Sequence, residues 1–244
     1  MKKKSAKKTD KLFKEKKKID FVFDKSVVDV FDNMLKRSVP FYNEIQRMII
    51  ELAQNFAKSN STIYDLGCSQ GTTCFNLSKN ISHKSIKIVG IDNSEDMIKE
   101  AKKRQNSIKN KKISFKQANI SENLILKNAS IAILSLTLQF VRPADRLSII
   151  KNIYRQLLPG GALILIEKNI LHGKLNRLFI DLYYSLKKRN NYTETEIAQK
   201  RLALENVLIP YTIEENRNLL KEAGFKNIET FFQWYNFSGI IAVK

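Results

Sequence analysis

A glycine-containing turn and an acidic residue, each at the end of an apolar run, are the residues whose spacing points to chemistry. The run 61–66 leads into Gly67-Cys68-Ser69-Gln70-Gly71, and the run 86–91 ends at Asp92. Glycines let the backbone approach a ligand closely, and a carboxylate about 20 residues further on accepts hydrogen bonds from ribose hydroxyls. The pair therefore indicates a nucleoside-containing cofactor. The form Asp-Leu-Gly-x-x-x-Gly favours S-adenosylmethionine (SAM) over a nicotinamide dinucleotide.

The composition is that of one globular domain. With 244 residues, 43% of them hydrophobic, the chain is long enough to bury one sizeable core. No apolar run reaches the ~18 residues of a membrane span, and no apolar stretch follows the N-terminal lysines as in a secretory signal. The two cysteines, Cys68 and Cys74, have no metal-ligand spacing and suggest no disulfide framework. We therefore expect a cytoplasmic protein without a membrane segment.

The net charge of +19 is distributed unevenly along the chain. Residues 1–18 hold ten lysines, one aspartate and one glutamate, for a local charge of +8. We predict that residues 1–20 form a disordered tail and that 21–244 form a single catalytic domain. A basic tail attracts nucleic acid or acidic partners, but a solvated arm is the simpler interpretation in a chain generally rich in lysine.

Short apolar runs alternate with helical patterns over most of the chain. This order predicts an α/β fold, with a doubly wound, seven-stranded, mostly parallel sheet, a C-terminal antiparallel hairpin and helical additions. A mostly helical insertion is expected at about 169–209, and Gly224 is expected to end a later helix. The predicted strands are 61–66, 86–91, 113–117, 130–135, 162–166, 227–232 and 237–243. The remaining predicted helices are 25–37, 41–57, 70–80, one opened by Ser94, 143–158 and 213–223.

Four of these strands should carry the ligand site, because ligands of such sheets bind beyond the carboxyl ends of the strands. We expect the backbone after the first strand to lie along the methionine and ribose, and residues after the second to bind ribose hydroxyls. Residues after the third would contact adenine, and the last residue of the fourth would lie beside the sulfonium. In that order the residues are Gly67, Cys68 and Ser69; Asp92 and Asn93; Asn119 and Ile120; and Ser135.

Other kinds of site have little support in the sequence. His83 and His172 have no cysteine or second histidine nearby, so no metal site is predicted. The run Gly67–Gly71 matches a nucleophile elbow only formally, because only His172 could complete a triad. The aromatic cluster 231–237 is interpreted as core of an edge strand, although aromatic residues also stack on RNA bases.

Several longer motifs resemble the carboxy-S-adenosylmethionine synthase family, bacterial enzymes that supply the carboxymethyl donor for tRNA wobble-uridine modification. The resemblance covers about residues 22–244. Besides the cofactor turn, it rests on Arg37-Ser38-Val39-Pro40-Phe41-Tyr42, Thr137-Leu138-Gln139-Phe140, Glu167-Lys168 and Gln199-Lys200-Arg201 followed by Leu204-Glu205-Asn206-Val207. The turn alone is shared by many methyltransferases, whereas these runs in this order are typical of a much smaller group of proteins.

The resemblance implies that SAM and prephenate give carboxy-SAM, phenylpyruvate and water. Prephenate loses carbon dioxide, the departing hydroxide removes a proton from the SAM methyl group, and the resulting carbanion captures the carbon dioxide. No metal is implied. The resemblance also implies a homodimer and a functional link to the downstream tRNA carboxymethyltransferase. Whether the chain binds tRNA directly is left open.

The resemblance also assigns residues to roles. Arg201 matches the arginine that holds the new carboxylate, in its own site or in one shared with the other subunit, because a guanidinium binds carboxylates bidentately. Taken alone, Arg201 and Lys200 would be interpreted as surface residues of a helix. Tyr42 matches the family's ligand-contacting tyrosine. Arg201 and Tyr42 are thus the predicted catalytic residues, and both are also predicted to contact the ligand.

Two residues depart from the family's usual pattern, and two alternative functions remain open. Asn119 stands where the family usually has aspartate, and Ser135 where it usually has asparagine. One alternative is a conventional SAM-dependent methyltransferase acting on tRNA or a small molecule. The other is a basic RNA-binding module that retains a SAM pocket, whose RNA affinity would fall steeply with salt.

Overall fold

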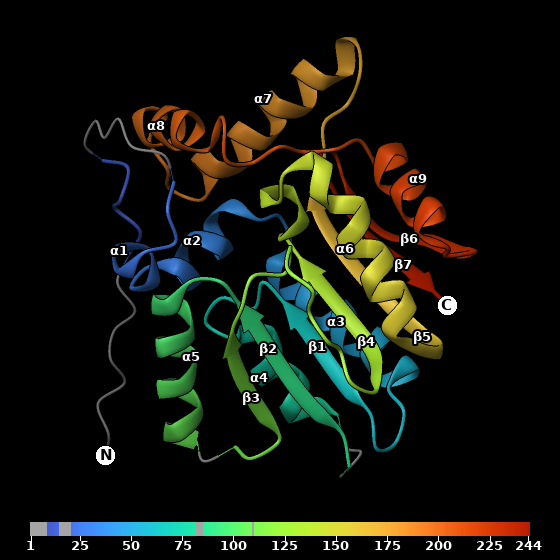
Figure 1. Ribbon diagram of the computed structural model, residues 1–244. Coiled ribbons are helices and arrows are strands. Elements are labelled where there is room, and N and C mark those ends of the chain that lie inside the picture. Colours follow the sequence, from blue (N-terminus) through green and yellow to red (C-terminus); the bar gives the residue numbers. More distant parts are fainter. Residues whose placement is uncertain (1–8, 15–20, 82–84, 109) are drawn as a thin grey trace.

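The protein is built around one seven-stranded sheet with the strand order β3-β2-β1-β4-β5-β7-β6 (Figure 1). The computed structural model describes residues 9–14, 21–81, 85–108 and 110–244. Strands β1 to β5 run parallel, and β7 pairs antiparallel with both β5 and β6. The strands are β1 (Thr62–Leu66), β2 (Lys87–Asp92), β3 (Ile113–Gln117), β4 (Ala129–Ser135), β5 (Leu157–Lys168), β6 (Asn227–Trp234) and β7 (Phe237–Val243). The predicted fold class is confirmed.

The central strands β1 and β4 are buried along nearly their whole length because helices cover both faces of the sheet. Alternate side chains of β4 therefore enter two separate cores: Ile131 and Ile133 point into one, and Ala132 and Leu134 into the other. The first core is closed by α3 (Tyr42–Phe56), α4 (Thr72–Asn80) and α5 (Glu95–Ile108). The second is closed by α6 (Pro143–Gln156) and α9 (Ile213–Ala223).

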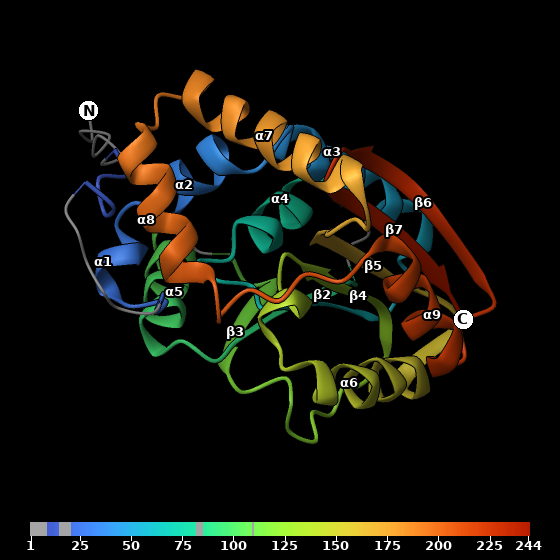
Figure 2. The same ribbon diagram turned by 90° about the horizontal axis from the view of Figure 1, so that it is seen from above.

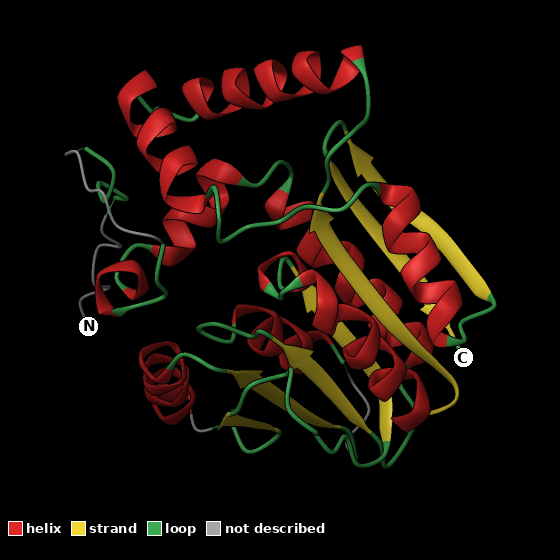
Figure 3. Cartoon of the chain, turned by 45° about the horizontal axis from the view of Figure 1, so that its top comes forward, coloured by secondary structure: helices red, strands yellow, loops and turns green. Residues whose placement is uncertain are grey.

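The remaining helices lie beyond the carboxyl ends of the strands (Figures 1 and 2). The predicted helix 25–37 is interrupted and forms α1 (Lys25–Val28) and α2 (Phe31–Ser38). The predicted helical insertion contains α7 (Lys174–Arg189) and α8 (Glu194–Leu204), and α8 begins with a capping box between Thr193 and Glu196. A short 3₁₀ helix, η1 (Leu138–Phe140), follows β4. Figure 3 shows α7 and α8 as a helical layer at one end of the sheet.

The predicted disordered tail is only partly described. Residues 1–8 and 15–20 lie outside the described residues, but residues 9–14 are packed against the domain. Asp10 is 1% exposed, and its carboxylate accepts a hydrogen bond from the Tyr192 hydroxyl. Arg37 donates to the Asp10 carbonyl at 2.9 Å. Residues 9–14 therefore belong to the folded domain and not to a disordered tail, because these contacts satisfy the carboxylate and the backbone carbonyl of Asp10.

Among the described residues, no helix combines the length and apolar character needed to cross a membrane.

Gly224 ends α9 as predicted, and its substitution tests how α9 packs on α6. Its φ is +115°, and a Cβ there would lie 2.7 Å from Cε1 of Tyr154. Backbone strain of this kind costs about 1–3 kcal/mol, so Gly224→Ala should lower the free energy of unfolding by at least that amount. Gly160→Ala is the control, because Gly160 also has positive φ but only Lys58 Nζ nearby, at 3.4 Å. Equal losses in urea denaturation would show that the Tyr154 contact is unimportant.

Candidate functional site

One cavity of about 760 Å³ lies at the carboxyl ends of β1, β2, β4 and β5. This volume is within the range of about 300–1,000 Å³ typical of small-molecule sites. All predicted ligand-binding residues except Arg201 line it, although they come from segments far apart in the sequence. These residues are Tyr42, Gly67, Cys68, Ser69, Asp92, Asn93, Asn119, Ile120 and Ser135.

The turn after β1 is held against the end of β2 by its backbone. The N–H groups of Gly67 and Cys68 both donate to the carbonyl of Ile91, at 2.7 and 2.9 Å. Gly67 has a φ of +80°, and a Cβ there would lie 2.3 Å from Cγ2 of Thr137. Only glycine therefore allows this turn to approach the segment after β4.

Asp92 connects the turn after β1 to the turn after β2. Its carboxylate accepts hydrogen bonds from the backbone N–H groups of Ser69 and Ser94, at 2.8 and 2.9 Å. Burial raises the pKa of Asp92, whereas these hydrogen bonds oppose the shift by stabilising the charged form. Each oxygen accepts one backbone hydrogen bond and keeps a lone pair, so the carboxylate can still accept from two ribose hydroxyls.

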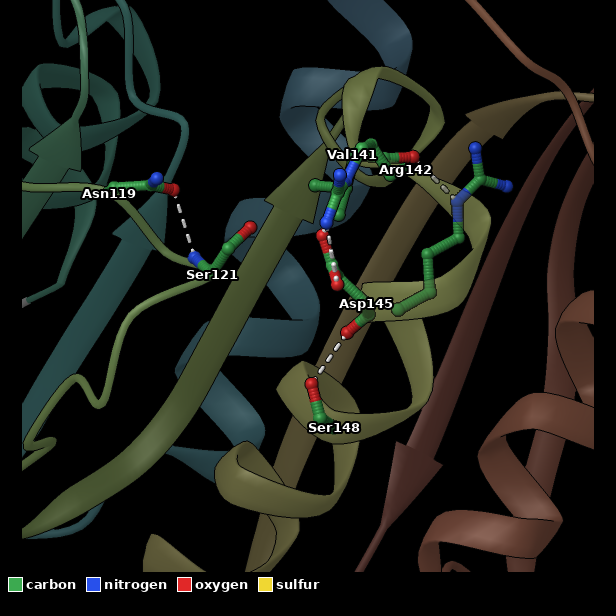
Figure 4. A network of polar contacts seen from close by, with 7 residues as sticks. Asn119, Ser121, Val141, Arg142, Asp145 and Ser148 are labelled. Carbon is green, nitrogen blue, oxygen red and sulfur yellow. Dashed lines mark hydrogen bonds and ion pairs between the residues drawn. The ribbon is translucent and has the colours of Figure 1, made fainter.

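Asn119 is fixed by its own loop, as Figure 4 shows: Oδ1 accepts a hydrogen bond from the Ser121 backbone at 3.0 Å. The second lone pair of Oδ1 can still accept from an adenine amino group, but Nδ2 can only donate. The aspartate usual in the family would offer a second acceptor oxygen at that position. The departure at Asn119 therefore exchanges one acceptor for a donor. On the opposite side of the view, Arg142 pairs with Asp145 at 3.0 Å.

Tyr42 and Ser135, from segments far apart in the sequence, both line the cavity. Tyr42 is buried at the start of α3, and burial, followed by the charges of Asp32 and Asp65, raises the pKa of its hydroxyl. The phenol therefore stays protonated and can donate a hydrogen bond. Beneath the turn, burial raises the pKa of Asp65 to about 7, while a hydrogen bond from the Cys74 thiol at 3.4 Å opposes that shift.

Arg201 does not line this cavity in the single chain. It is exposed on α8 and borders a separate surface depression with residues of α7 such as Tyr184. Its neighbour Lys200, which the sequence alone places on the surface as well, is buried and lines the main cavity. The two side chains therefore leave α8 in different directions.

Sequence reasoning missed the cationic end of the cavity. Lys168, at the end of β5, lines it together with Lys200 and Tyr183. The Lys168 ammonium group lies 5.1 Å from the centre of the Tyr183 ring. The available signal was the spacing of Ile197, Lys200 and Ala203, three residues apart on α8 and all buried.

The arrangement combines a carboxylate for ribose hydroxyls at one end of the cavity with ammonium groups at the other. Aromatic side chains of the N-terminal segment and of η1 also line the cavity and form an aromatic wall; the ring of Phe23 packs edge-on against that of Phe140, with ring centres 5.3 Å apart. No group of three or more potential metal ligands occurs among the residues described, which do not include His83. The cavity thus suits an organic ligand with a nucleoside and anionic groups.

Comparison with known proteins supports this interpretation. A family model described as a methyltransferase domain matches residues 57–224. The carboxy-S-adenosyl-L-methionine synthase of Methylococcus capsulatus is 49% identical, over 92% of this chain and 94% of that protein. The one from Nautilia profundicola is 44% identical, over 96% and 99%. The resemblance predicted from the motifs is confirmed.

Solved structures share the fold at low identity. An O-methyltransferase family protein from Burkholderia thailandensis is 16% identical, with a TM-score of 0.67 over 91% of this chain. Human N-acetylserotonin methyltransferase, solved in complex with SAM, is 17% identical, with a TM-score of 0.59 over 90% of this chain. The chain spans 60% and 56% of those two structures. At this identity, the likeness concerns the fold alone.

Asp92→Ala tests whether this carboxylate binds the ligand. The change removes a charged acceptor for two hydroxyls, which contributes about 1.5–3 kcal/mol, so SAM affinity should fall roughly tenfold to a hundredfold. Titration calorimetry with SAM measures the effect. Glu95→Ala is the control, because Glu95 is an exposed acid three residues away that pairs with Lys99 at 2.8 Å. An unchanged dissociation constant in Asp92→Ala would exclude Asp92 from the site.

Proposed function

Because the chain belongs to the carboxy-S-adenosyl-L-methionine synthase family, we propose that it converts SAM and prephenate to carboxy-SAM, phenylpyruvate and water. The observation that carries the proposal is the 49% identity to such a synthase over nearly the whole of both chains. The cavity supports it, because a pocket for a nucleoside continues into a cationic end that a simple methyl donor does not require.

The reaction balances without a further reactant. Prephenate loses its ring carboxylate as carbon dioxide and its hydroxyl as hydroxide, which leaves phenylpyruvate. The hydroxide takes a proton from the methyl group of SAM, which the neighbouring sulfonium makes acidic, and forms water. The carbanion left on that carbon bonds to the carbon dioxide. A closed cavity protects the carbanion from solvent, which is the contribution expected of the aromatic wall and of Tyr42.

Arg201 is proposed to hold the new carboxylate in the site of a second subunit. Its exposure on α8, outside the cavity of its own chain, supports this arrangement. Leu178 on α7 and Leu202 beside Arg201 are also exposed, at 49% and 51%, and a second copy would cover such side chains. We propose a homodimer in which α8 of one chain reaches the cavity of the other.

The product would serve a cytoplasmic tRNA carboxymethyltransferase that modifies wobble uridine. This link is a proposal about where carboxy-SAM is used, and it requires no tRNA contact by the present chain.

Mass spectrometry tests the proposed activity directly. Purified protein incubated with SAM and prephenate should yield a compound 44 mass units heavier than SAM, together with phenylpyruvate. Omission of prephenate is the control and should give neither product. If SAM stays unchanged with prephenate but methyl groups pass to tRNA or a small molecule, the chain is a conventional methyltransferase.

Arg201→Ala tests the carboxylate anchor. SAM binding should be unchanged, whereas carboxy-SAM affinity should fall about tenfold to a hundredfold, because one charge-assisted pair is lost. Carboxy-SAM formation should fall with it. Arg155→Ala, at an exposed arginine of α6, should change neither quantity. Equal losses for SAM and carboxy-SAM would assign Arg201 to the fold or to the shared methionine part instead.

A further inference from the structure

Three lysine side chains gather at one end of the cavity, where Lys187 and Lys200 are buried and Lys168 is half-buried, and we refer to them as the lysine cluster. Lys168 ends β5, Lys187 belongs to α7 and Lys200 to α8. Lys187 and Lys200 are each 5% exposed. Lys168 and Lys200 line the cavity, and Lys187 lies behind Tyr183, with its ammonium group 4.6 Å from the ring centre.

The protein only partly neutralises this cluster. The Lys200 ammonium donates to Ser38 Oγ at 2.8 Å, and the charge of Asp10 stabilises it. No hydrogen bond or ion pair from the described residues reaches Nζ of Lys168 or of Lys187. Apart from the rings of Tyr183 and Tyr184, these two ammonium groups thus have no partner in the part of the chain that is described.

Burial of these cations opposes folding. It lowers the pKa of Lys168 and of Lys200 to about 8, and that of Lys187 well below its usual value. Placing a charge in a poorly hydrated site without a counterion costs free energy, and neighbouring like charges add to the cost. Apolar side chains of similar size would fill the same space more favourably. The cluster therefore calls for an explanation other than stability.

The strand order places the cluster beyond the expected position of the reacting methyl group. Along the rim the strand ends follow the order β2, β1, β4, β5. With strands about 4.8 Å apart, the end of β5 lies on the order of 14 Å from Asp92, but only one strand from Ser135. A SAM molecule anchored at Asp92, with its sulfonium near Ser135, would thus point its methyl group toward Lys168.

We propose that Lys168 and Lys200 bind a carboxylate of the second substrate, the dicarboxylate prephenate, at this end of the cavity. The inference deepens the proposed function and rests on it. The bound carboxylate would supply the negative charge that the protein itself does not provide. Inside a cavity such charge-assisted contacts are stronger than in water. The site differs from the role of Arg201, which is assigned to the carboxylate of the product.

Lys168→Met and Lys200→Met test this site, with Lys151→Met as the control at an exposed lysine of α6. Each cluster variant should raise the KM for prephenate about tenfold to a hundredfold, through loss of one charge-assisted contact. The dissociation constants of SAM and carboxy-SAM should be unchanged. Without ligand, Lys168→Met should also unfold at a higher temperature than the wild type, because a poorly hydrated charge without a hydrogen-bond partner among the described residues has been removed. Lys168→Arg should recover part of the prephenate affinity.

Other outcomes would overturn the proposal. An unchanged KM for prephenate would exclude the lysines from its site. A parallel loss of SAM affinity would mean that they hold the amino-acid carboxylate of SAM, and a loss confined to carboxy-SAM would assign them to the product. Lys168→Gln, which keeps a donor without charge, replaces Lys168→Met if that variant fails to fold.

Direct binding separates failure of this proposal from failure of the proposed function. Calorimetry measures prephenate binding to protein loaded with S-adenosylhomocysteine, which cannot react. If prephenate binding depends on the lysines but the wild type does not turn over SAM, the proposed carboxylate site is supported and the proposed synthase activity is refuted. If the wild type turns over SAM but prephenate binding does not depend on the lysines, the proposed carboxylate site is refuted and the proposed synthase activity is supported.

Discussion

The contact between Asp92 and the backbone of Ser69 is the interaction on which the geometry of the cavity depends. It joins the turns after β1 and β2 at 2.8 Å, next to the two hydrogen bonds that the Ile91 carbonyl accepts. Both turns are therefore positioned before a ligand arrives. Since a ligand meets a prepared acceptor, less ordering is needed on binding, and preorganisation of this kind improves affinity.

The helical layer of α7 and α8 covers the rim that the carboxyl ends of the strands form (Figure 1). A sheet of this type has an open edge at its carboxyl ends, and here α7 and α8 cover it. The cover is held from below by Arg37, which donates to the carbonyls of Asn190 and Asp10 at 2.8 and 2.9 Å. The segment around Asp10 thus helps to hold this cover in place, because its contacts tie α2 to the turn between α7 and α8.

The sequence was informative where local chemistry determines structure. Strand ends, the Gly67 turn and the Gly224 cap follow from apolar runs and from backbone conformations that glycine adopts easily. Lys200 was misjudged because its burial is decided by Ser38, 162 residues away in the chain, and by Tyr192. Asp10 was placed in a tail for the same reason: its partner Tyr192 is 182 residues away. Contacts of this range leave little local pattern: for Lys200 the one signal was its spacing from Ile197 and Ala203 on α8.

The cavity that these long-range contacts enclose lowers the stability of the fold, because it holds lysine charges in a poorly hydrated place. Lys168 lies at the end of β5, whose residues 162–166 are apolar and buried, and its ammonium group lies 5.1 Å from the centre of the Tyr183 ring. A fold selected for stability alone would place an apolar side chain there. Because Asp92 and the lysine cluster occupy opposite ends of the rim, the cavity is polarised along its length. A ligand pair with hydroxyls at one end and a carboxylate at the other is the arrangement that this charge distribution favours.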